Sequence, residues 1–216
     1  MSHINNSRIH PDIRKIGIIA RKLVPVMDAK FFRRGNFFMR HVVQGRFPKD
    51  MQVDEHWAPR PDGTQLRIVV ARSLRPKPMA TGVLWFHGGG YAMEIPEMDL
   101  SYARKVQAVS NSVVVMPDYR LSTEYQYPAA LDDAYLALEW MRDNHESLGI
   151  NPQQLFVAGE SAGGGLTAAL TLYARDKGEI SIAFQMPLYP MLDDRPTSSS
   201  TDNDAPIWNS RDNDNA

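Results

Sequence analysis

The sequence has no cysteine among its 216 residues. Disulfide bridges, thiol catalysis and thiolate-bound metals are therefore excluded, because each needs a cysteine sulfur. The chain also lacks any apolar run near the roughly 18 residues of a membrane-spanning helix, and Lys and Arg interrupt its start, where a secretory signal needs a continuous hydrophobic stretch. We therefore expect a cytoplasmic protein without a transmembrane segment.

An excess of charge of one sign is missing as well. The 24 Lys and Arg nearly balance the 25 Asp and Glu, and the resulting net charge of -1 disfavours a nucleic-acid partner. The sequence contains neither a P-loop nor a G-x-G-x-x-G run, and its 6 histidines include no pair four residues apart. We therefore expect no metal, no cofactor and no bound nucleic acid.

The charge is unevenly distributed along the chain. Residues 1–60 hold 12 Lys and Arg and 5 Asp and Glu, a net charge of +7. The remainder holds the other 12 Lys and Arg and 20 Asp and Glu, a net charge of -8. This asymmetry separates an N-terminal appendage from the body. We predict an N-terminal helical cap over residues 1–47, a core over 48–192, and a polar segment over 193–216 that begins a cap or linker.

Two amphipathic helices are predicted in the appendage. Residues at helical spacing predict a first helix that ends near Pro25, and a second is expected over 29–43. The apolar positions of the first are Ile13, Ile16, Ala20 and Leu23. In the second, Phe31, Phe32, Phe37 and Phe38 are mixed with arginines. Such a face suits either a membrane surface or packing on the body, and we favour packing.

Short β-rich runs alternate with helical patterns in the body of the chain. The predicted strands are 53–57, 66–71, 83–86, 113–116, 155–158 and 184–189, and the predicted helices are 100–110, 128–145 and 162–176. This alternation is typical of an α/β fold with a mostly parallel sheet. The segment after residue 192 is rich in Asp, Ser, Asn and Thr, and its composition predicts a solvated loop.

The run Gly159-Glu160-Ser161-Ala162-Gly163 fits the pattern G-x-S-x-G. It lies between a predicted strand and a predicted helix, where a sharp turn exposes the serine hydroxyl and the two glycines give clearance. Ser161 is therefore a candidate nucleophile. The alternative is a serine that only caps a helix after a glycine turn.

The run His87-Gly88-Gly89-Gly90 follows another predicted strand. By chance it is expected only about 0.002 times in a chain of this composition. Its glycines let the backbone approach an acyl group, so that the N–H groups of Gly88 and Gly89, with that of Ala162, face a developing oxyanion. We interpret His87 as a structural histidine, because it precedes Ser161 in the chain and adjoins the oxyanion glycines.

Three blocks of the sequence together resemble the hormone-sensitive-lipase-like family of α/β-hydrolase esterases. They are His87-Gly88-Gly89-Gly90-Tyr91, then Asp118-Tyr119-Arg120-Leu121 with Tyr127-Pro128-Ala129-Ala130-Leu131-Asp132-Asp133-Ala134, and Gly159-Glu160-Ser161-Ala162-Gly163-Gly164. The resemblance spans residues 53–194. It implies a small-molecule ester substrate, Ser161 as nucleophile, an oxyanion hole of Gly88, Gly89 and Ala162, and N-terminal helices that cap the acyl pocket.

The chain also departs from the family pattern. Ser122-Thr123-Glu124-Tyr125 stands where the family usually has Ala-Pro-Glu-His, and Glu160 stands where Asp is commoner. No histidine follows His145, although the α/β-hydrolase order is nucleophile, acid, histidine. The acids Asp193, Asp194, Asp202 and Asp204 show no triad spacing, and we interpret them as solvated.

These departures lead to three hypotheses. The first is a serine carboxylesterase or lipase-type hydrolase that is impaired in this chain, because the triad acid and histidine are absent. The second is a non-catalytic ligand-binding protein on the same scaffold. The third is a truncated part of a longer esterase that lacks the last strands. In that case the strand over 184–189 is an open sheet edge and predicts an edge-mediated homo-oligomer.

Overall fold

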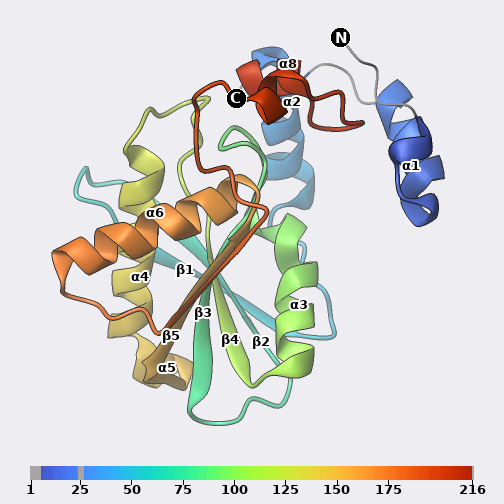
Figure 1. Cartoon of the computed structure of the whole chain (residues 1–216). Helices are drawn as coiled ribbons and strands as arrows, with labels where there is room; N and C mark the ends of the chain where they lie inside the picture. The colour runs from blue at the N-terminus through green and yellow to red at the C-terminus, as the bar shows by residue number, and fades with distance from the viewer. Residues whose placement is uncertain (1–5, 24–26, 216) are drawn as a thin grey trace.

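The computed structural model describes residues 6–23 and 27–215 of the chain. In this described part, the centre is a six-stranded sheet with the order β1-β2-β4-β3-β5-β6 (Figure 1). The strands are β1 (Gln52–Pro59), β2 (Gln65–Arg72), β3 (Ala80–Phe86), β4 (Ser112–Pro117), β5 (Ile150–Glu160) and β6 (Phe184–Leu188). Each lies where the sequence predicts a strand, and the predicted α/β fold is confirmed.

The sheet has an antiparallel part and a parallel part. β1 pairs antiparallel with β2, and β2 pairs antiparallel with β4. The β1–β2 turn contains Gly63 at φ 83°, and the Asp62 carboxylate accepts a hydrogen bond from Thr64 N at 2.9 Å. β3 pairs parallel with β4 and β5, and β5 pairs parallel with β6. The mostly parallel sheet predicted from continuous apolar runs is therefore present.

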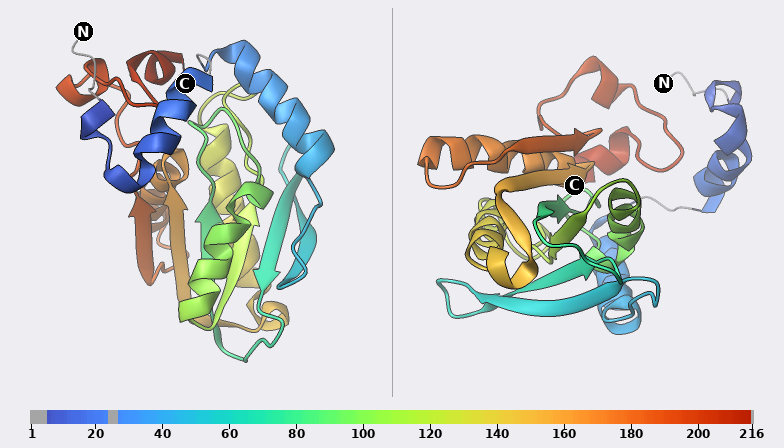
Figure 2. Two further views of the ribbon diagram at one scale, coloured as in Figure 1. Left: turned by 90° about the vertical axis from the view of Figure 1, so that its right-hand side faces the viewer. Right: turned by 90° about the horizontal axis from the view of Figure 1, so that it is seen from below.

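Helices cover both faces of the sheet, as seen from below in Figure 2. α4 (Ala129–Asp143) and α6 (Ala162–Lys177) lie on one face, and α3 (Leu100–Val109) lies on the other. Leu138 and Leu170 pack against Leu84 and Phe86 on the first face, whereas Leu100 packs near Trp85 on the second. Short helices α5 (His145–Leu148) and η3 (Pro96–Asp99) complete the body. No helix in the described ranges is long and apolar enough to cross a bilayer.

The appendage contains η1 (Asn6–Arg8), α1 (Pro11–Leu23), α2 (Ala29–Phe38) and η2 (Met39–Val43). Both predicted helices are present, although the predicted end near Pro25 lies outside the described residues. Asp28 caps α2 by accepting hydrogen bonds from two backbone N–H groups. The buried Phe32 packs against Ala92 in the loop after β3. Phe37 and Phe38 are 65% and 56% exposed, so packing on the body accounts for only part of the aromatic face.

The C-terminal segment differs from the predicted solvated loop. It forms α7 (Ser198–Thr201) and α8 (Ser210–Asn215), which lie above the strand ends near α2 (Figure 1). Asp212 is 1% exposed, and its carboxylate accepts a hydrogen bond from Met27 N at 2.9 Å. The prediction was wrong here because composition does not reveal a distant N–H group that a buried carboxylate can satisfy. Asp193, Asp194 and Asp202 are exposed as predicted, whereas Asp204 is partly buried and its carboxylate lies 4.0 Å from the Arg21 guanidinium.

Candidate active site

Ser161 stands between β5 and α6 with a strained backbone. Its φ of 54° and ψ of -118° are rare for a residue with a side chain and cost on the order of 1–3 kcal/mol. Neighbouring segments hold this conformation: Ser161 N donates to the Leu188 carbonyl at 2.9 Å, and Met191 N donates to the Ser161 carbonyl at 2.9 Å. A sharp strand-to-helix turn therefore lies where the G-x-S-x-G pattern predicts it.

Gly159 and Gly163 supply the space that this turn needs. A Cβ atom on Gly163 would overlap the carbonyl oxygens of Phe86 and His87, and one on Gly159 would overlap the carbonyl of Gly163. β3 and β5 are neighbours, with Phe86 opposite Gly159. The two glycine-rich loops therefore begin side by side at the carboxyl ends of parallel strands, where open α/β sheets place their ligands.

The loop after β3 carries the three consecutive glycines. Gly89 and Gly90 have φ values of 89° and 63°, and a Cβ on Gly90 would overlap the ring of Trp208. Within the described part of the chain, the backbone N–H groups of Gly88, Gly89 and Ala162 have no hydrogen-bond acceptor. Unpaired donors beside a candidate nucleophile are the arrangement that stabilises an oxyanion.

His87 is buried beneath this loop. Its ring is 1% exposed, stacks on Tyr119 at 4.3 Å, and bonds the Gly88 carbonyl through Nδ1 at 3.0 Å. Because a carbonyl only accepts, Nδ1 carries the proton, and Nε2 has no partner among the described residues. Burial lowers the pKa of His87 to about 4. These contacts support a neutral structural histidine.

Three carboxyl groups meet behind the glycine loop. One oxygen each from Glu94, Asp99 and Glu160 lies within 4.8 Å of the others. Burial, together with the charges of Asp99 and Glu160, raises the pKa of Glu94 to about 7. Burial also raises the pKa of Asp99 to about 6. Because both shifts favour the protonated form, Glu94 and Asp99 keep their protons to higher pH than exposed carboxyl groups do.

Aromatic residues connect this cluster to three other elements. Trp85 Nε1 donates to the Asp99 carboxylate at 2.7 Å, and the Trp85 ring stacks on Tyr102 with 4.8 Å between centroids. The Tyr102 hydroxyl lies 3.1 Å from that of Tyr189, and burial together with the nearby Glu160 carboxylate raises the pKa of Tyr189. Strand β3, helix α3 and the chain after β6 are therefore linked to the residue that precedes Ser161.

A buried ion cluster fixes the short helix that carries Asp99. Arg67 of β2 is 7% exposed, and it bonds Glu97 of η3, Glu55 at 2.6 Å and Asp118 at 3.4 Å. Gly45 N also donates to Glu97, at 2.8 Å. A buried carboxylate with this many partners is held in one position, so η3 is anchored to both the sheet and the appendage.

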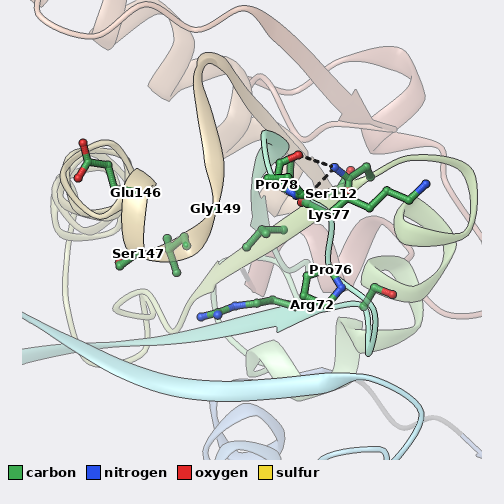
Figure 3. Close-up of a pocket in the computed structure, with 13 residues that line it drawn as sticks. Arg72, Pro76, Lys77, Pro78, Ser112, Glu146, Ser147 and Gly149 are labelled. Atoms are coloured by element: carbon green, nitrogen blue, oxygen red, sulfur yellow. Dashed lines mark hydrogen bonds between the residues drawn. The ribbon is translucent and has the colours of Figure 1, made fainter.

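A separate cavity lies at the other end of the sheet (Figure 3). It has a volume of about 270 Å³, and Arg72, Lys77, Ser112 and Glu146 are among its lining residues. These residues adjoin the start of β3, β4 and β5 or the end of β2. Ligands of open α/β sheets bind at the opposite, carboxyl ends of parallel strands, so we assign this cavity no role in the site around Ser161.

Comparison with known proteins identifies the family. Residues 83–216 match a family model described as alpha/beta hydrolase fold, and the chain belongs to this family. It is 39% identical over 127 residues to the carboxylesterase NlhH of Mycobacterium tuberculosis, a match that covers 58% of this chain and 40% of that protein. It is 31% identical over 134 residues to the arylacetamide deacetylase of Bos taurus, a match that covers 59% of this chain and 33% of the deacetylase. The chain thus spans less than half the length of these relatives.

Solved structures agree with this assignment. A bacterial heroin esterase superposes with a TM-score of 0.79 at 29% identity. The superposition covers 91% of this chain and 64% of the heroin esterase chain. A hyperthermophilic esterase from Pyrobaculum calidifontis superposes with a TM-score of 0.77 at 31% identity. That superposition covers 94% of this chain and 67% of the esterase chain. The resemblance to hormone-sensitive-lipase-like esterases inferred from three sequence blocks is confirmed.

The structure brings the predicted site residues together and adds others. His87, Gly88, Gly89 and Gly90 adjoin Gly159, Glu160, Ser161, Ala162 and Gly163 at the ends of β3 and β5. Sequence reasoning missed Glu94, Asp99 and Trp85. A signal was present, because Glu94, Glu97 and Asp99 place three acids within six residues just after the glycine loop.

Proposed function

We propose that this chain provides the nucleophile and oxyanion hole of a serine carboxylesterase that acts on small carboxylic esters. The observation that carries the proposal is the strained Ser161 turn, packed against a glycine loop that has unpaired N–H donors. The names of its relatives, which include carboxylesterase and arylesterase, support the same reaction class.

The proposed reaction begins when Ser161 Oγ attacks the ester carbonyl carbon and transfers its proton to a base. The N–H groups of Gly88, Gly89 and Ala162 donate to the oxyanion of the tetrahedral intermediate, where each donor is typically worth about 3–4 kcal/mol. The alcohol then leaves, and water hydrolyses the acyl group on Ser161. No step uses a metal or cofactor.

The base is the part that no described histidine supplies. The ring nitrogens of His41, His87 and His145 bond backbone carbonyls, His10 lies beside Asp12 N, and His56 Nε2 has no partner. None of these described histidines hydrogen-bonds Ser161. Loss of the histidine from a serine hydrolase costs about 10⁶ in turnover. We therefore infer that the 216-residue chain is a poor catalyst.

A non-catalytic ligand-binding protein remains the second candidate, and the absence of a histidine on Ser161 among the described residues favours it. The unpaired N–H groups of the glycine loop would then bind a carboxylate or carbonyl without reaction. The two candidates differ in whether a covalent acyl group forms on Ser161.

Chemical rescue distinguishes them. The 216-residue chain and Ser161→Ala are assayed with p-nitrophenyl acetate, with and without imidazole as a diffusible base. We expect weak turnover alone and an imidazole-dependent increase that the Ser161→Ala protein does not show. Equal rates for both proteins at every imidazole concentration would favour the binding protein. Robust Ser161-dependent turnover without imidazole would refute the impairment but support the nucleophile.

We further propose that the appendage is a cap. Its support is the packing of α2 on the loop after the oxyanion glycines: Gly35 adjoins the Met93 side chain, and Asn36 Nδ2 donates to the Ala92 carbonyl at 2.9 Å. A helix held in this way restricts the approach to the glycine loop from one side. In this proposal, residues 1–47 therefore form part of the substrate pocket.

A further inference from the structure

Glu94 has a backbone conformation that its residue type does not favour. Its φ is 92°, a value that glycine adopts readily and that costs other residues energy. Such strain persists only where surrounding contacts fix the residue. The Glu94 side chain is partly buried, and one of its carboxyl oxygens lies within 4.8 Å of an oxygen of Asp99 and of Glu160.

Both oxyanion glycines touch this cluster. The Cα of Gly88 faces the Glu160 carboxylate so closely that a Cβ there would overlap it. A Cβ on Gly89 would overlap the Met93 carbonyl and lie 3.0 Å from Glu94 Cγ. Ala92 N and Met93 N both donate to the Gly89 carbonyl, at 3.1 and 3.0 Å, which closes the turn. A displacement of Glu94 or Glu160 is therefore transmitted directly to Gly88 and Gly89.

The groups that act on Glu94 have one sign of charge. Asp99 from η3 and Glu160 from β5 face it, and the buried phenol of Tyr119 also interacts with it electrostatically. Among the described residues, the charges that shift the pKa of Glu94 are both acidic. Three ionised carboxylates at this spacing would repel one another strongly in a partly buried site. A proton on Glu94 removes that repulsion and supplies an O–H donor for a neighbouring carboxylate.

We propose that Glu94 is a positioning residue whose carboxylic acid, beside those of Asp99 and Glu160, holds the Gly88–Gly89 backbone against the Ser161 turn, and that deprotonation releases this loop. The inference rests on the proposed function only in giving Gly88 and Gly89 the role of oxyanion donors. Loss of the Glu94 proton would add a third negative charge beside them. This negative charge would destabilise the oxyanion and would also loosen the loop.

The test follows the two amides directly and needs no turnover. The chain is labelled with ¹⁵N-glycine, which restricts the spectrum to 14 glycines, and the Gly88 and Gly89 amide shifts are followed from pH 5 to pH 9. In the unmodified chain we expect both amides to move in one step with a midpoint near 7, since burial and two neighbouring charges raise the pKa of Glu94 to about 7. In Glu94→Gln, which keeps a neutral donor, we expect the step to disappear.

Two further variants make the result decisive. Glu146→Gln removes an exposed carboxylate near the start of β5, at the opposite end of the sheet, and should leave the step unchanged. Glu94→Gly suits the φ of 92° and tests the carboxyl group if Glu94→Gln does not fold. Gly88 and Gly89 amides that stay constant from pH 5 to pH 9, or a step that survives loss of the Glu94 carboxyl, would overturn the proposal. Neither outcome bears on whether Ser161 is acylated.

Discussion

Phe86 and Gly159 lie opposite each other in the last register of the parallel strands β3 and β5. Each is followed by one of the two glycine-rich loops, so their pairing places His87-Gly88-Gly89-Gly90 beside Ser161. The contact is made by backbone: the Phe86 carbonyl occupies the space that a side chain at position 163 would need. The geometry of the proposed oxyanion hole thus depends on Gly159 and Gly163, where a side chain would overlap neighbouring backbone carbonyls.

The first prediction concerns Gly163→Ala. A Cβ at this position meets two carbonyl groups in the adjoining strand end, so we expect a loss of about 3 kcal/mol or more in the free energy of unfolding. Gly17→Ala is the matched control, because Gly17 is also helical and the nearest side-chain atoms would lie 3.3–3.6 Å from its Cβ. It should be neutral or stabilising. Urea unfolding of both variants checks this, and equal effects would contradict the close approach.

The second prediction is a pH dependence of stability. Folding raises the pKa of Glu94 from 4.5 to about 7, so the folded state binds more protons between these values and stability falls as pH rises through them. Glu94→Gln should match the unmodified chain near pH 4.5 and exceed its stability by about 1–3 kcal/mol at pH 8. Urea midpoints at both pH values measure this. A difference between the two proteins that stays constant with pH would refute it.

The third prediction concerns Trp85→Phe, which removes the N–H donor to Asp99. Burial raises the pKa of Asp99, and the hydrogen bond from Trp85 lowers it. Loss of this hydrogen bond should therefore raise the pKa of Asp99 further. We also expect a loss of about 1.5–3 kcal/mol in stability, as for other hydrogen bonds to charged groups. Trp57→Phe is the control, since Trp57 is 55% exposed. Urea unfolding and carboxyl ¹³C titration provide the two readouts, and two indistinguishable variants would contradict the role of Trp85.

The fourth prediction concerns the outer side of β6, which no described strand pairs. Phe184 is 52% exposed there, and an apolar sheet edge favours association with a second copy. Phe184→Lys should reduce the sedimentation coefficient of the 216-residue chain. Leu172→Lys, at a residue 54% exposed on α6, should not. A monomeric unmodified chain would show that this edge does not self-associate.

Local patterns in the sequence predict much of this fold. The strands and helices of the body, from β1 to β6, follow from short apolar runs and helical spacings, because burial on a sheet or helix face imposes those periods. Ser161 and the glycine loop were also predicted, since a tight turn and a close backbone approach demand glycine at fixed positions. Such requirements act within a few residues.

Relationships between distant residues could not be predicted in the same way. Trp85, Asp99, Tyr102, Glu160 and Tyr189 form one network only because strands β3, β5 and β6 are neighbours in the sheet. The buried Asp212 likewise depends on Met27, 185 residues away. Composition made the C-terminal segment look solvated, because the partner that stabilises its carboxylate lies at the other end of the chain.

The central claim is that Ser161 is the nucleophile of this chain. The most direct measurement is to expose the 216-residue chain to a fluorophosphonate ester with and without imidazole, and to map the modified residue by peptide mass spectrometry. We predict modification at Ser161 that imidazole accelerates, with no modification of the same peptide in Ser161→Ala. Modification spread over other serines, or an unmodified Ser161 at high imidazole concentration, would contradict the claim.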